Sequence, residues 1–91
     1  MISEQGIQKS ITKWLESKGA YVVKVIQANR AGVADILCCL DGRFYAIEVK
    51  TPRGVVAPLQ VYHQELVEKS GGIAMIARSL DDVKSKIPVN P

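Results

Sequence analysis

The chain has 91 residues, a net charge of +3 and a pI of about 9.0, and 47% of its residues are hydrophobic. This length allows one small domain with a modest core, and the mild basic excess fits a polyanionic partner without requiring one. No apolar run approaches membrane-spanning length and the start of the chain is too polar for a signal peptide, so we expect an intracellular, cytoplasmic protein without membrane contacts.

A first helix is predicted over residues 3–18. Ser3 suits the N-cap, and Lys18-Gly19 supplies a C-terminal stop. Between them, apolar residues recur at helical spacing at Ile7, Ile11, Trp14 and Leu15. Glu4 lies on the same stripe as three of these residues. It is either a favourable acid at a helix N-terminus or a third carboxylate aimed at the charged end of the hairpin that follows.

Residues 20–26, AYVVKVI, are dense in β-branched side chains and predict the first strand. Lys24 interrupts this run, and it lies either on a solvated face or opposite a phosphate. The polar loop over residues 27–32 can carry Arg30 towards a ligand. Gly32 allows a bend at the end of this loop.

Residues 33–50 predict two apolar strands joined by a tight turn at Asp41-Gly42, a dipeptide typical of a two-residue β-hairpin. Residues equidistant from such a turn face each other, so Asp35 is expected directly opposite Glu48. Because side chains alternate along a strand, Lys50 projects from the same face as these two acids. The remaining residues of that face are apolar, and we therefore expect it to be buried: Leu37, Cys39, Phe44 and Ala46.

Two carboxylates across a ladder repel each other unless a cation or a shared proton compensates. Oxygen ligands without a convergent histidine or cysteine suit a hard cation such as Mg²⁺ or Mn²⁺, whose usual work is to orient and polarise phosphates. The alternative is that Asp35 and Glu48 end their strands in solvent and that Lys50 is a surface lysine. A buried acid pair without a purpose is costly, which favours the metal site.

The cysteine and histidine pattern indicates no other metal or cofactor. Cys38 and Cys39 are adjacent in a predicted strand and point to opposite faces, so a disulfide between them would be strained. Small apolar strand residues in a reducing compartment are the simpler interpretation. The single His63 has no serine or cysteine arranged to act with it, and no small-molecule cofactor is expected.

A loop over residues 51–58 is long enough to act as a flap, with Arg53 at a flexible point before Pro58 begins the second helix. Gln60 lies in the opening turn of this helix, beside backbone amides that attract phosphate, or it is an ordinary exposed glutamine. Gly71-Gly72 ends the helix. A fourth strand over residues 73–77 and a short helix capped by Ser79 then complete the chain.

The predicted order is α-β-β-β-α-β-α, an α/β fold of the α+β type with a mixed sheet. The second helix should cross over and deliver the fourth strand parallel to the third. We find no repeat, low-complexity tract or domain boundary, so residues 1–91 are expected to form a single domain.

Several of these segments together resemble the VRR-NUC family, the virus-type replication-repair nucleases of the PD-(D/E)-x-K superfamily. The resemblance runs from about residue 3 to residue 83. It is carried by the leading Glu4, the bend Gly32-Val-Ala-Asp35, the strand end Glu48-Val-Lys50, the helix start Pro58-Leu-Gln60 and the later double glycine. It implies a restriction-endonuclease-like core in a single VRR-NUC-like domain.

The resemblance also implies metal-dependent cleavage of phosphodiester bonds in DNA. Asp35 and Glu48 match the metal-binding acids, with the main-chain carbonyl of Val49 as a further ligand. Glu4 resembles the first-helix acid that supports the metal or the water, and Lys50 the lysine that orients the attacking water and stabilises the charged phosphorane. Gln60 matches the glutamine that begins the following helix.

Two features depart from the family pattern. Ala34 stands where a proline commonly precedes the acid, which removes no ligand. The loop over residues 27–32 is shorter than in many relatives, so their substrate-loop contacts do not carry over. A small, mildly basic domain should bind DNA mainly through its phosphates, and the candidates for these contacts are Lys24, Arg30 and Arg53.

Stand-alone viral relatives of this size resemble homodimeric resolvases of four-way (Holliday) junctions, and a dyad would suit paired nicks on a symmetric junction. The alternatives are a nicking, flap or restriction-like nuclease, and a non-catalytic DNA-binding module of the same fold. If the source is a virus, the site of action is the host cytoplasm. Apolar positions of the second helix and fourth strand are candidates for the dimer surface: Tyr62, Val67, Ile73, Met75 and Ile76.

Overall fold

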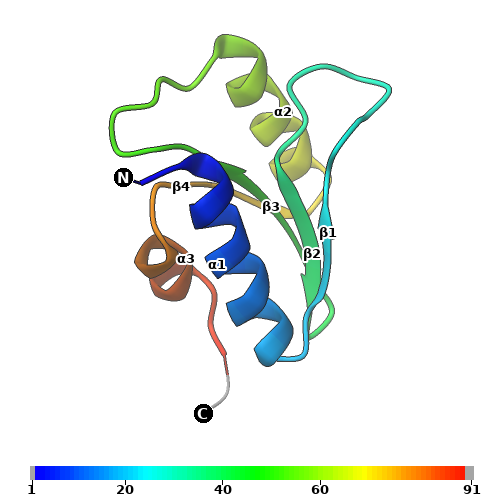
Figure 1. Ribbon diagram of the computed structural model, residues 1–91. Coiled ribbons are helices and arrows are strands. Elements are labelled where there is room, and N and C mark those ends of the chain that lie inside the picture. Colours follow the sequence, from blue (N-terminus) through cyan, green and yellow to red (C-terminus); the bar gives the residue numbers. More distant parts are fainter. Residues whose placement is uncertain (1, 90–91) are drawn as a thin grey trace.

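The computed structural model describes residues 2–89, and its elements follow the predicted order (Figure 1). The helices are α1 (Glu4–Ser17), α2 (Pro58–Lys69) and α3 (Leu80–Lys86), and the strands are β1 (Tyr21–Lys24), β2 (Ile36–Leu40), β3 (Arg43–Val49) and β4 (Ile73–Ala77). The fold is therefore of the α+β type with a mixed sheet, as predicted. No helix in residues 2–89 is both long enough and apolar enough to cross a membrane.

Helix α1 has the limits that its sequence predicts. The Ser3 Oγ accepts a hydrogen bond from the Gly6 N–H at 3.1 Å, which satisfies one of the free amides of the first turn. After Lys18 the chain leaves the helix through Gly19, whose φ of 89° lies in the left-handed region that glycine tolerates. The helix buries Ile7, Ile11 and Leu15 against the sheet.

The β2–β3 hairpin has the predicted register. Asp41 and Gly42 both have positive φ, 53° and 78°, as a type I′ turn requires. Leu40 pairs with Arg43 and Leu37 with Ala46. Strand β1 is shorter than predicted and ends at residue 24, although the Val25 N–H still donates to the Asp35 carbonyl at 2.8 Å.

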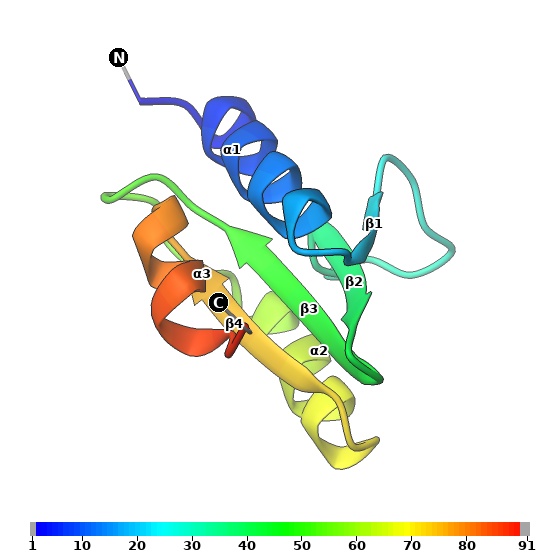
Figure 2. The same cartoon turned by 90° about the horizontal axis from the view of Figure 1, so that it is seen from below.

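The four strands form one sheet in the order β1-β2-β3-β4. The first three are antiparallel neighbours, and β4 lies parallel to β3 because α2 carries the chain back between them. Helices α1 and α3 cover one face of the sheet, and α2 covers the other (Figures 1 and 2). The parallel pair brings the ends of β3 and β4 to the same edge of the sheet.

The main hydrophobic core lies between the sheet and the α1–α3 layer. Side chains alternate between the two faces along β2 and β3. The core-facing residues are therefore those that lie between the residues of the acid-bearing face in sequence. The side chains that are almost wholly buried there are Ile11, Leu15, Ile36, Tyr45, Ile47, Val49, Val83 and Ile87. Cys38 joins this core, whereas Cys39 is exposed on the other face, and both are free thiols.

The face that carries Glu48 is only partly buried, and the expectation of a fully covered face is wrong. Ala46 and Glu48 are buried, Leu37 is half-buried, and Cys39 and Phe44 are exposed. The reason is the position of α2, which packs mainly on β4 and on part of β3 and leaves β1, β2 and the start of β3 open on this face. Burial on the β2–β3 part of this face is therefore greatest at Ala46 and Glu48, in the second half of β3.

Candidate active site

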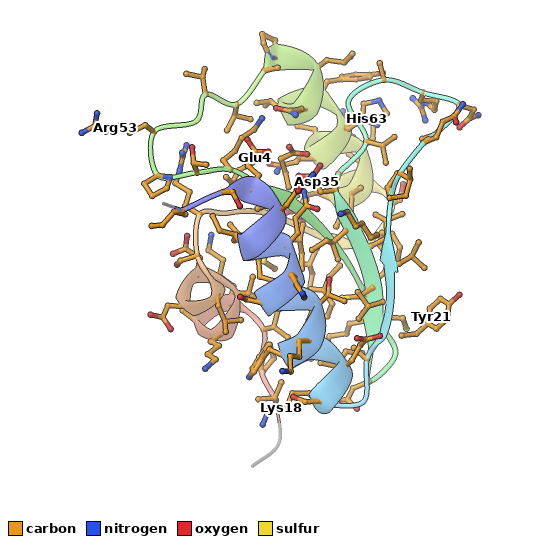
Figure 3. All side chains as sticks on the ribbon, in the orientation of Figure 1. Glu4, Lys18, Tyr21, Asp35, Arg53 and His63 are labelled. Atoms are coloured by element: carbon orange, nitrogen blue, oxygen red, sulfur yellow. The ribbon has the colours of Figure 1, made fainter. Side chains whose placement is uncertain are left out.

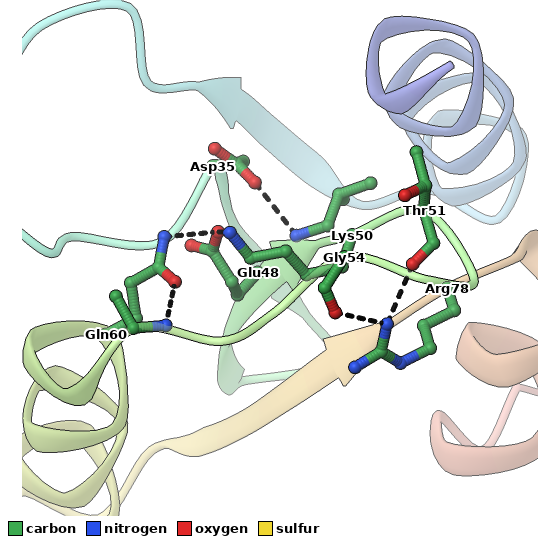
Figure 4. Close-up of polar contacts among 9 residues, drawn as sticks. Asp35, Glu48, Lys50, Thr51, Gly54, Gln60 and Arg78 are labelled. Atoms are coloured by element: carbon green, nitrogen blue, oxygen red, sulfur yellow. Dashed lines mark hydrogen bonds and ion pairs between the residues drawn. The ribbon is translucent and has the colours of Figure 1, made fainter. Parts of the chain in front are cut away.

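Asp35 and Glu48 meet at the end of the hairpin that lies opposite its turn (Figure 4). Asp35 directly precedes β2, and its Oδ2 accepts a hydrogen bond from the Val49 N–H at 2.8 Å. The Asp35 carbonyl accepts a hydrogen bond from the Val25 N–H just after β1, so the backbone and the side chain of Asp35 are both held in place. The Asp35 carboxylate thus lies across the end of β3, next to Glu48.

Glu48 is the most unusual side chain of the sheet, because it is only 3% exposed and carries a carboxylate. Its Oε2 accepts a hydrogen bond from the Gln60 Nε2 at 2.9 Å and lies 3.6 Å from the Lys50 Nζ. Its Oε1 is buried and has no hydrogen-bond partner among residues 2–89. A buried carboxylate oxygen without a donor is costly, so this atom is suited to an added donor or cation.

The pKa of Glu48 also indicates that the pair of Asp35 and Glu48 is suited to an added cation. Burial, and then the neighbouring charge of Asp35, raise the pKa of Glu48 from 4.5 to about 7. The Lys50 ammonium opposes this shift and does not cancel it. Two close acids therefore share this end of the sheet without enough positive charge to keep both ionised.

Lys50 is held beside Glu48 by the loop that follows it. The Arg78 guanidinium, just after β4, donates from one nitrogen to the carbonyls of Thr51 at 2.7 Å and Gly54 at 2.8 Å (Figure 4). The Lys50 N–H in turn donates to the carbonyl at the end of β4, at 3.0 Å. Only 13% of the Lys50 side chain is exposed. Arg78 therefore closes the 51–54 turn and keeps Lys50 at the site.

Sequence reasoning did not find Arg78. A signal was available, because parallel strands β3 and β4 end at the same edge and a residue that follows β4 must lie near Lys50. The predicted parallel pairing of these strands could therefore have indicated that Arg78 lies near the residues that follow β3.

Gln60 is the third residue of α2 and serves two groups at once. Its Oε1 accepts a hydrogen bond from the Ala57 N–H at 2.9 Å, and its Nε2 donates to Glu48. One amide at the start of the helix, that of Ala57, is thus occupied by Gln60 itself. Gln60 is neither an ordinary exposed glutamine nor a free phosphate ligand in this structure.

Glu4 is not part of a preformed metal cluster. It is half-buried in the first turn of α1, at the same end of the molecule as Asp35 (Figure 3). Within residues 2–89, however, no three side chains of histidine, cysteine, aspartate or glutamate are grouped closely enough to hold a metal ion. The structure therefore brings together Asp35, Glu48, Lys50 and Gln60, and leaves Glu4 outside this group.

The three predicted phosphate-binding residues lie on separate segments. Lys24 is exposed at the end of β1 and Arg53 projects outward from the β3–α2 loop (Figure 3). Arg30 lies in the loop over residues 27–32 and borders a groove on the α2 side of the sheet. The three residues therefore come from three different segments, and Arg30 and Lys24 line different hollows of the surface.

Two glutamines that each have a buried, unpaired side-chain atom were also missed. The Nε2 of Gln64 has no hydrogen-bond partner in residues 2–89, and Gln64 shares with Glu48 and Gln60 a small cavity of about 40 Å³ under α2. Gln8 on α1 likewise has a buried, unpaired Oε1. Gln64 follows Gln60 by one helical turn, so the spacing of four residues was the signal for a shared face.

The donor set fits a hard divalent cation. Asp35 and Glu48 supply carboxylate oxygens, and the Val49 carbonyl lies between Glu48 and Lys50 in sequence. Among residues 2–89, no histidine or cysteine forms a metal-sized group with the two acids. Such oxygen-only sets suit Mg²⁺ or Mn²⁺. A cation at this position would also satisfy the unpaired Glu48 Oε1 and relieve the repulsion between the two acids.

Comparison of the whole structure with solved structures gives the same fold. One solved VRR-NUC domain is 27% identical in sequence to this chain and superposes with a TM-score of 0.79. The match covers 90% of this chain and 90% of that domain's chain. The chain has a VRR-NUC domain fold. A second VRR-NUC domain protein is 20% identical, covers 93% of this chain and 84% of its own, and has a TM-score of 0.77. By sequence, the chain matches no family model and no curated protein.

A third structure extends the comparison beyond VRR-NUC proteins. Hjc of Archaeoglobus fulgidus, a Holliday junction resolvase from an archaeal hyperthermophile, is 19% identical, covers 80% of this chain and 65% of its own, and has a TM-score of 0.63. At this identity the likeness concerns the fold. Together the three neighbours confirm the predicted resemblance and support a nuclease of the VRR-NUC fold.

Proposed function

We propose that this VRR-NUC domain is a divalent-metal-dependent DNA endonuclease that hydrolyses phosphodiester bonds. The observation that carries the proposal is the Glu48 carboxylate, which is buried beside Asp35 and has one unpaired oxygen. A structural acid in such a place would have a donor for each oxygen. The nuclease names of the structural neighbours support the same class of reaction.

Asp35, Glu48 and the Val49 carbonyl are the residues that would hold Mg²⁺ or Mn²⁺. A bound ion would supply Lewis-acid chemistry towards a phosphate oxygen and the attacking water. Gln60 fixes the Oε2 of Glu48, which leaves Oε1 for this role. We assign Glu4 the weaker role of supporting the metal or the water through solvent, because it lies outside the acid pair.

Lys50 acts through its charge in this scheme. Its Nζ lies 3.6 Å from the Glu48 Oε2, so a phosphate bound at the acid pair would lie within reach of the ammonium. The lysine would orient the attacking water and stabilise the negative charge that develops on the phosphorus oxygens. It holds no metal, because an ammonium has no free lone pair.

We propose branched DNA as the substrate, with a four-way junction cleaved by a homodimer as the first candidate. The resolvase among the structural neighbours and the small size of the domain support this choice. A nicking or flap nuclease is the second candidate, because it needs only one active site and no second copy of the chain. The set Asp35, Glu48, Lys50 and Gln60 assembled at one site speaks against a purely DNA-binding module.

A panel of end-labelled DNAs tests the proposal. Four-way junction, flap, blunt duplex and single-stranded DNA are incubated with the protein in Mg²⁺, in Mn²⁺ and in excess chelator. We expect metal-dependent cuts near the branch of the junction or flap, and little cutting of blunt duplex. Binding of branched DNA without any cleavage in either metal would instead establish a non-catalytic module.

A further inference from the structure

Helix α2 carries two glutamines on the face that meets Glu48. Gln60 and Gln64 are four residues apart, so their side chains leave the helix one turn from each other on the same face. Gln60 donates a hydrogen bond directly to the Glu48 Oε2 at 2.9 Å, as Figure 4 shows. Gln64 lines the small cavity under α2 that Glu48 and Gln60 also line. Both glutamines therefore come from α2 to the surroundings of one carboxylate.

Two residues that line this cavity each carry an unpaired polar atom. The Gln64 Nε2 is a buried donor without a hydrogen-bond partner among residues 2–89, and the Glu48 Oε1 is a buried acceptor in the same condition. Side chains four residues apart on a helix start about 5–6 Å from each other, whereas both oxygens of a carboxylate belong to one small group. Gln60 thus reaches the carboxylate directly, and Gln64 falls short of it.

The size of the cavity suits one water molecule. A cavity needs about 10–15 Å³ to hold a water, and sites for larger ligands start at about 300 Å³. The volume here is about 40 Å³. The loop before β2 lies close against α2 at this cavity, because a Cβ on Gly32 would stand only 2.8 Å from the Leu59 carbonyl oxygen and 3.0 Å from the His63 ring. A buried water normally joins polar groups that lack other partners, and the Gln64 donor and the Glu48 acceptor are such a pair.

We propose that Gln64 is a positioning residue of the candidate active site and holds the Glu48 Oε1 through one buried water. This water accepts a hydrogen bond from the Gln64 Nε2 and donates one to the Glu48 Oε1. The inference rests on the proposed function and deepens it, because α2 then fixes both oxygens of Glu48, one through Gln60 and the other through Gln64. Partners behind a metal ligand fix its orientation and strengthen metal binding.

The arrangement leaves the side of Glu48 next to Asp35 for the metal. A carboxylate offers about four lone-pair sites, and Gln60 and the water use two of them. The cavity itself does not suit a cation, because the buried Gln64 Nε2 carries hydrogens and no lone pair for a metal. A cation would therefore approach Glu48 from Asp35, whose Oδ2 is already held by the Val49 N–H at 2.8 Å.

A double-mutant cycle in the metal-free protein tests the link between Gln64 and Glu48. Gln64→Met keeps the length of the side chain and removes the donor, and Glu48→Met removes the acceptor. Urea unfolding in chelator is measured for the wild type, both single variants and the double variant. Gln5→Met, at an exposed glutamine of α1, is the matched control in the same two backgrounds. Gln64→Ala takes the place of Gln64→Met if that variant does not fold.

We expect Gln64→Met to lower the folding equilibrium constant about five- to tenfold in the wild-type background, the usual effect of losing one buried hydrogen bond. In the Glu48→Met background the same change should cost less than about twofold, because the acceptor is already gone. The control should cost less than about twofold in both backgrounds. A crystal structure of the metal-free wild type should show one water within hydrogen-bond distance of the Gln64 Nε2 and the Glu48 Oε1.

Calorimetry with Mn²⁺ alone separates a positioning residue from a merely structural one. Gln64→Met should bind Mn²⁺ about tenfold more weakly than the wild type, the lower end of the effect expected for a partner behind a metal ligand. Gln5→Met should bind Mn²⁺ as the wild type does. A residue that only stabilises α2 would leave the Mn²⁺ affinity of the folded variant unchanged.

Equal losses of stability in both backgrounds, or no loss in either, would overturn the link between Gln64 and Glu48. A metal-free crystal structure without that water would do the same. Unchanged Mn²⁺ affinity in a folded Gln64 variant would overturn the positioning role. The proposed function fails separately, if the wild type binds no Mn²⁺ and cuts no DNA; stability coupling between Gln64 and Glu48 would then establish the buried link without a metal site.

Discussion

At the scale of single residues, the Glu48 carboxylate makes the stability of the metal-free protein depend on pH. Its pKa is raised from 4.5 to about 7, first by burial and then by Asp35. Between these values the folded protein keeps a proton that the unfolded chain has released, so the contribution of Glu48 to stability is fully present below about pH 4.5 and is lost as pH rises to about 7. Glu48→Gln should remove this loss.

Thermal melts in chelator, at pH values below and above that window, measure the effect. A stability loss of about 1 kcal/mol lowers the melting temperature of a domain this size by about 4–8 °C. We expect the wild type to lose several degrees more than Glu48→Gln across the window, and Mg²⁺ to restore the wild type alone. Parallel pH curves for the two proteins would show that Glu48 titrates normally.

Lys50 should separate turnover from metal binding. Lys50→Ala is expected to lower the cleavage rate by about 10²–10³-fold, the usual cost of removing one group that stabilises transition-state charge. Mn²⁺ binding, followed by calorimetry, should remain. Lys13→Ala, a lysine replacement on exposed α1, serves as the control. Loss of metal binding together with activity would mean that Lys50 instead organises the acid pair.

At the scale of whole elements, α2 is attached to the site by Gln60. Gln60→Ala removes the acceptor for the Ala57 N–H and the donor to Glu48. We expect a loss of about 1–2 kcal/mol in urea unfolding and a slower cleavage rate. Gln5→Ala, an exposed glutamine of α1, is the matched control. Normal stability with normal cleavage would leave Gln60 with no role in the site.

The elements that the sequence predicts well are those with local causes. The Asp41-Gly42 turn determines the β2–β3 register, and Ser3 and Gly19 bound α1 through caps that involve neighbouring residues. The convergence of Asp35 and Glu48 follows from that register, so this part of the site was also predictable. The metal and catalytic roles assigned to these residues stay predictions.

The features that were missed depend on how separate elements meet. Both faces of the hairpin carry mostly apolar side chains, so the local sequence does not show which face a helix will cover. In the structure, α1 covers the face that carries Tyr45, and α2 covers only part of the face that carries Glu48. Phe44 was for this reason expected to be buried. Arg78 reaches Thr51 across 27 positions of sequence, and this contact exists only once β4 has paired with β3.

At the scale of the whole molecule, we expect a homodimer. Exposed apolar side chains on α2, Leu59 and Tyr62, are spaced to share one face of the helix and are 46% and 50% exposed. Of the positions predicted for this surface, Met75 is buried in the core and cannot contribute. Val67, Ile73 and Ile76 are half-buried.

Light scattering at micromolar concentration should give twice the chain mass of 9.9 kDa. Tyr62→Ser should shift the protein towards monomer and change paired nicks on a four-way junction into single nicks. Tyr21→Ser, at an exposed tyrosine of β1, is the control. A wild-type monomer that makes paired nicks would remove the dimer and favour the nicking or flap alternative.

The central claim is that Asp35 and Glu48 form a metal-dependent nuclease site, and the rate of branched-DNA cleavage in Mg²⁺ by Asp35→Asn tests it most directly. Asparagine keeps an oxygen that can accept from the Val49 N–H, so the fold should persist. Asp41→Asn, in the turn at the opposite end of the hairpin, makes the same change where φ is positive and tolerated. We predict no measurable cleavage by Asp35→Asn and wild-type cleavage by Asp41→Asn. Undiminished cleavage by Asp35→Asn, or by the wild type in excess chelator, would contradict the account.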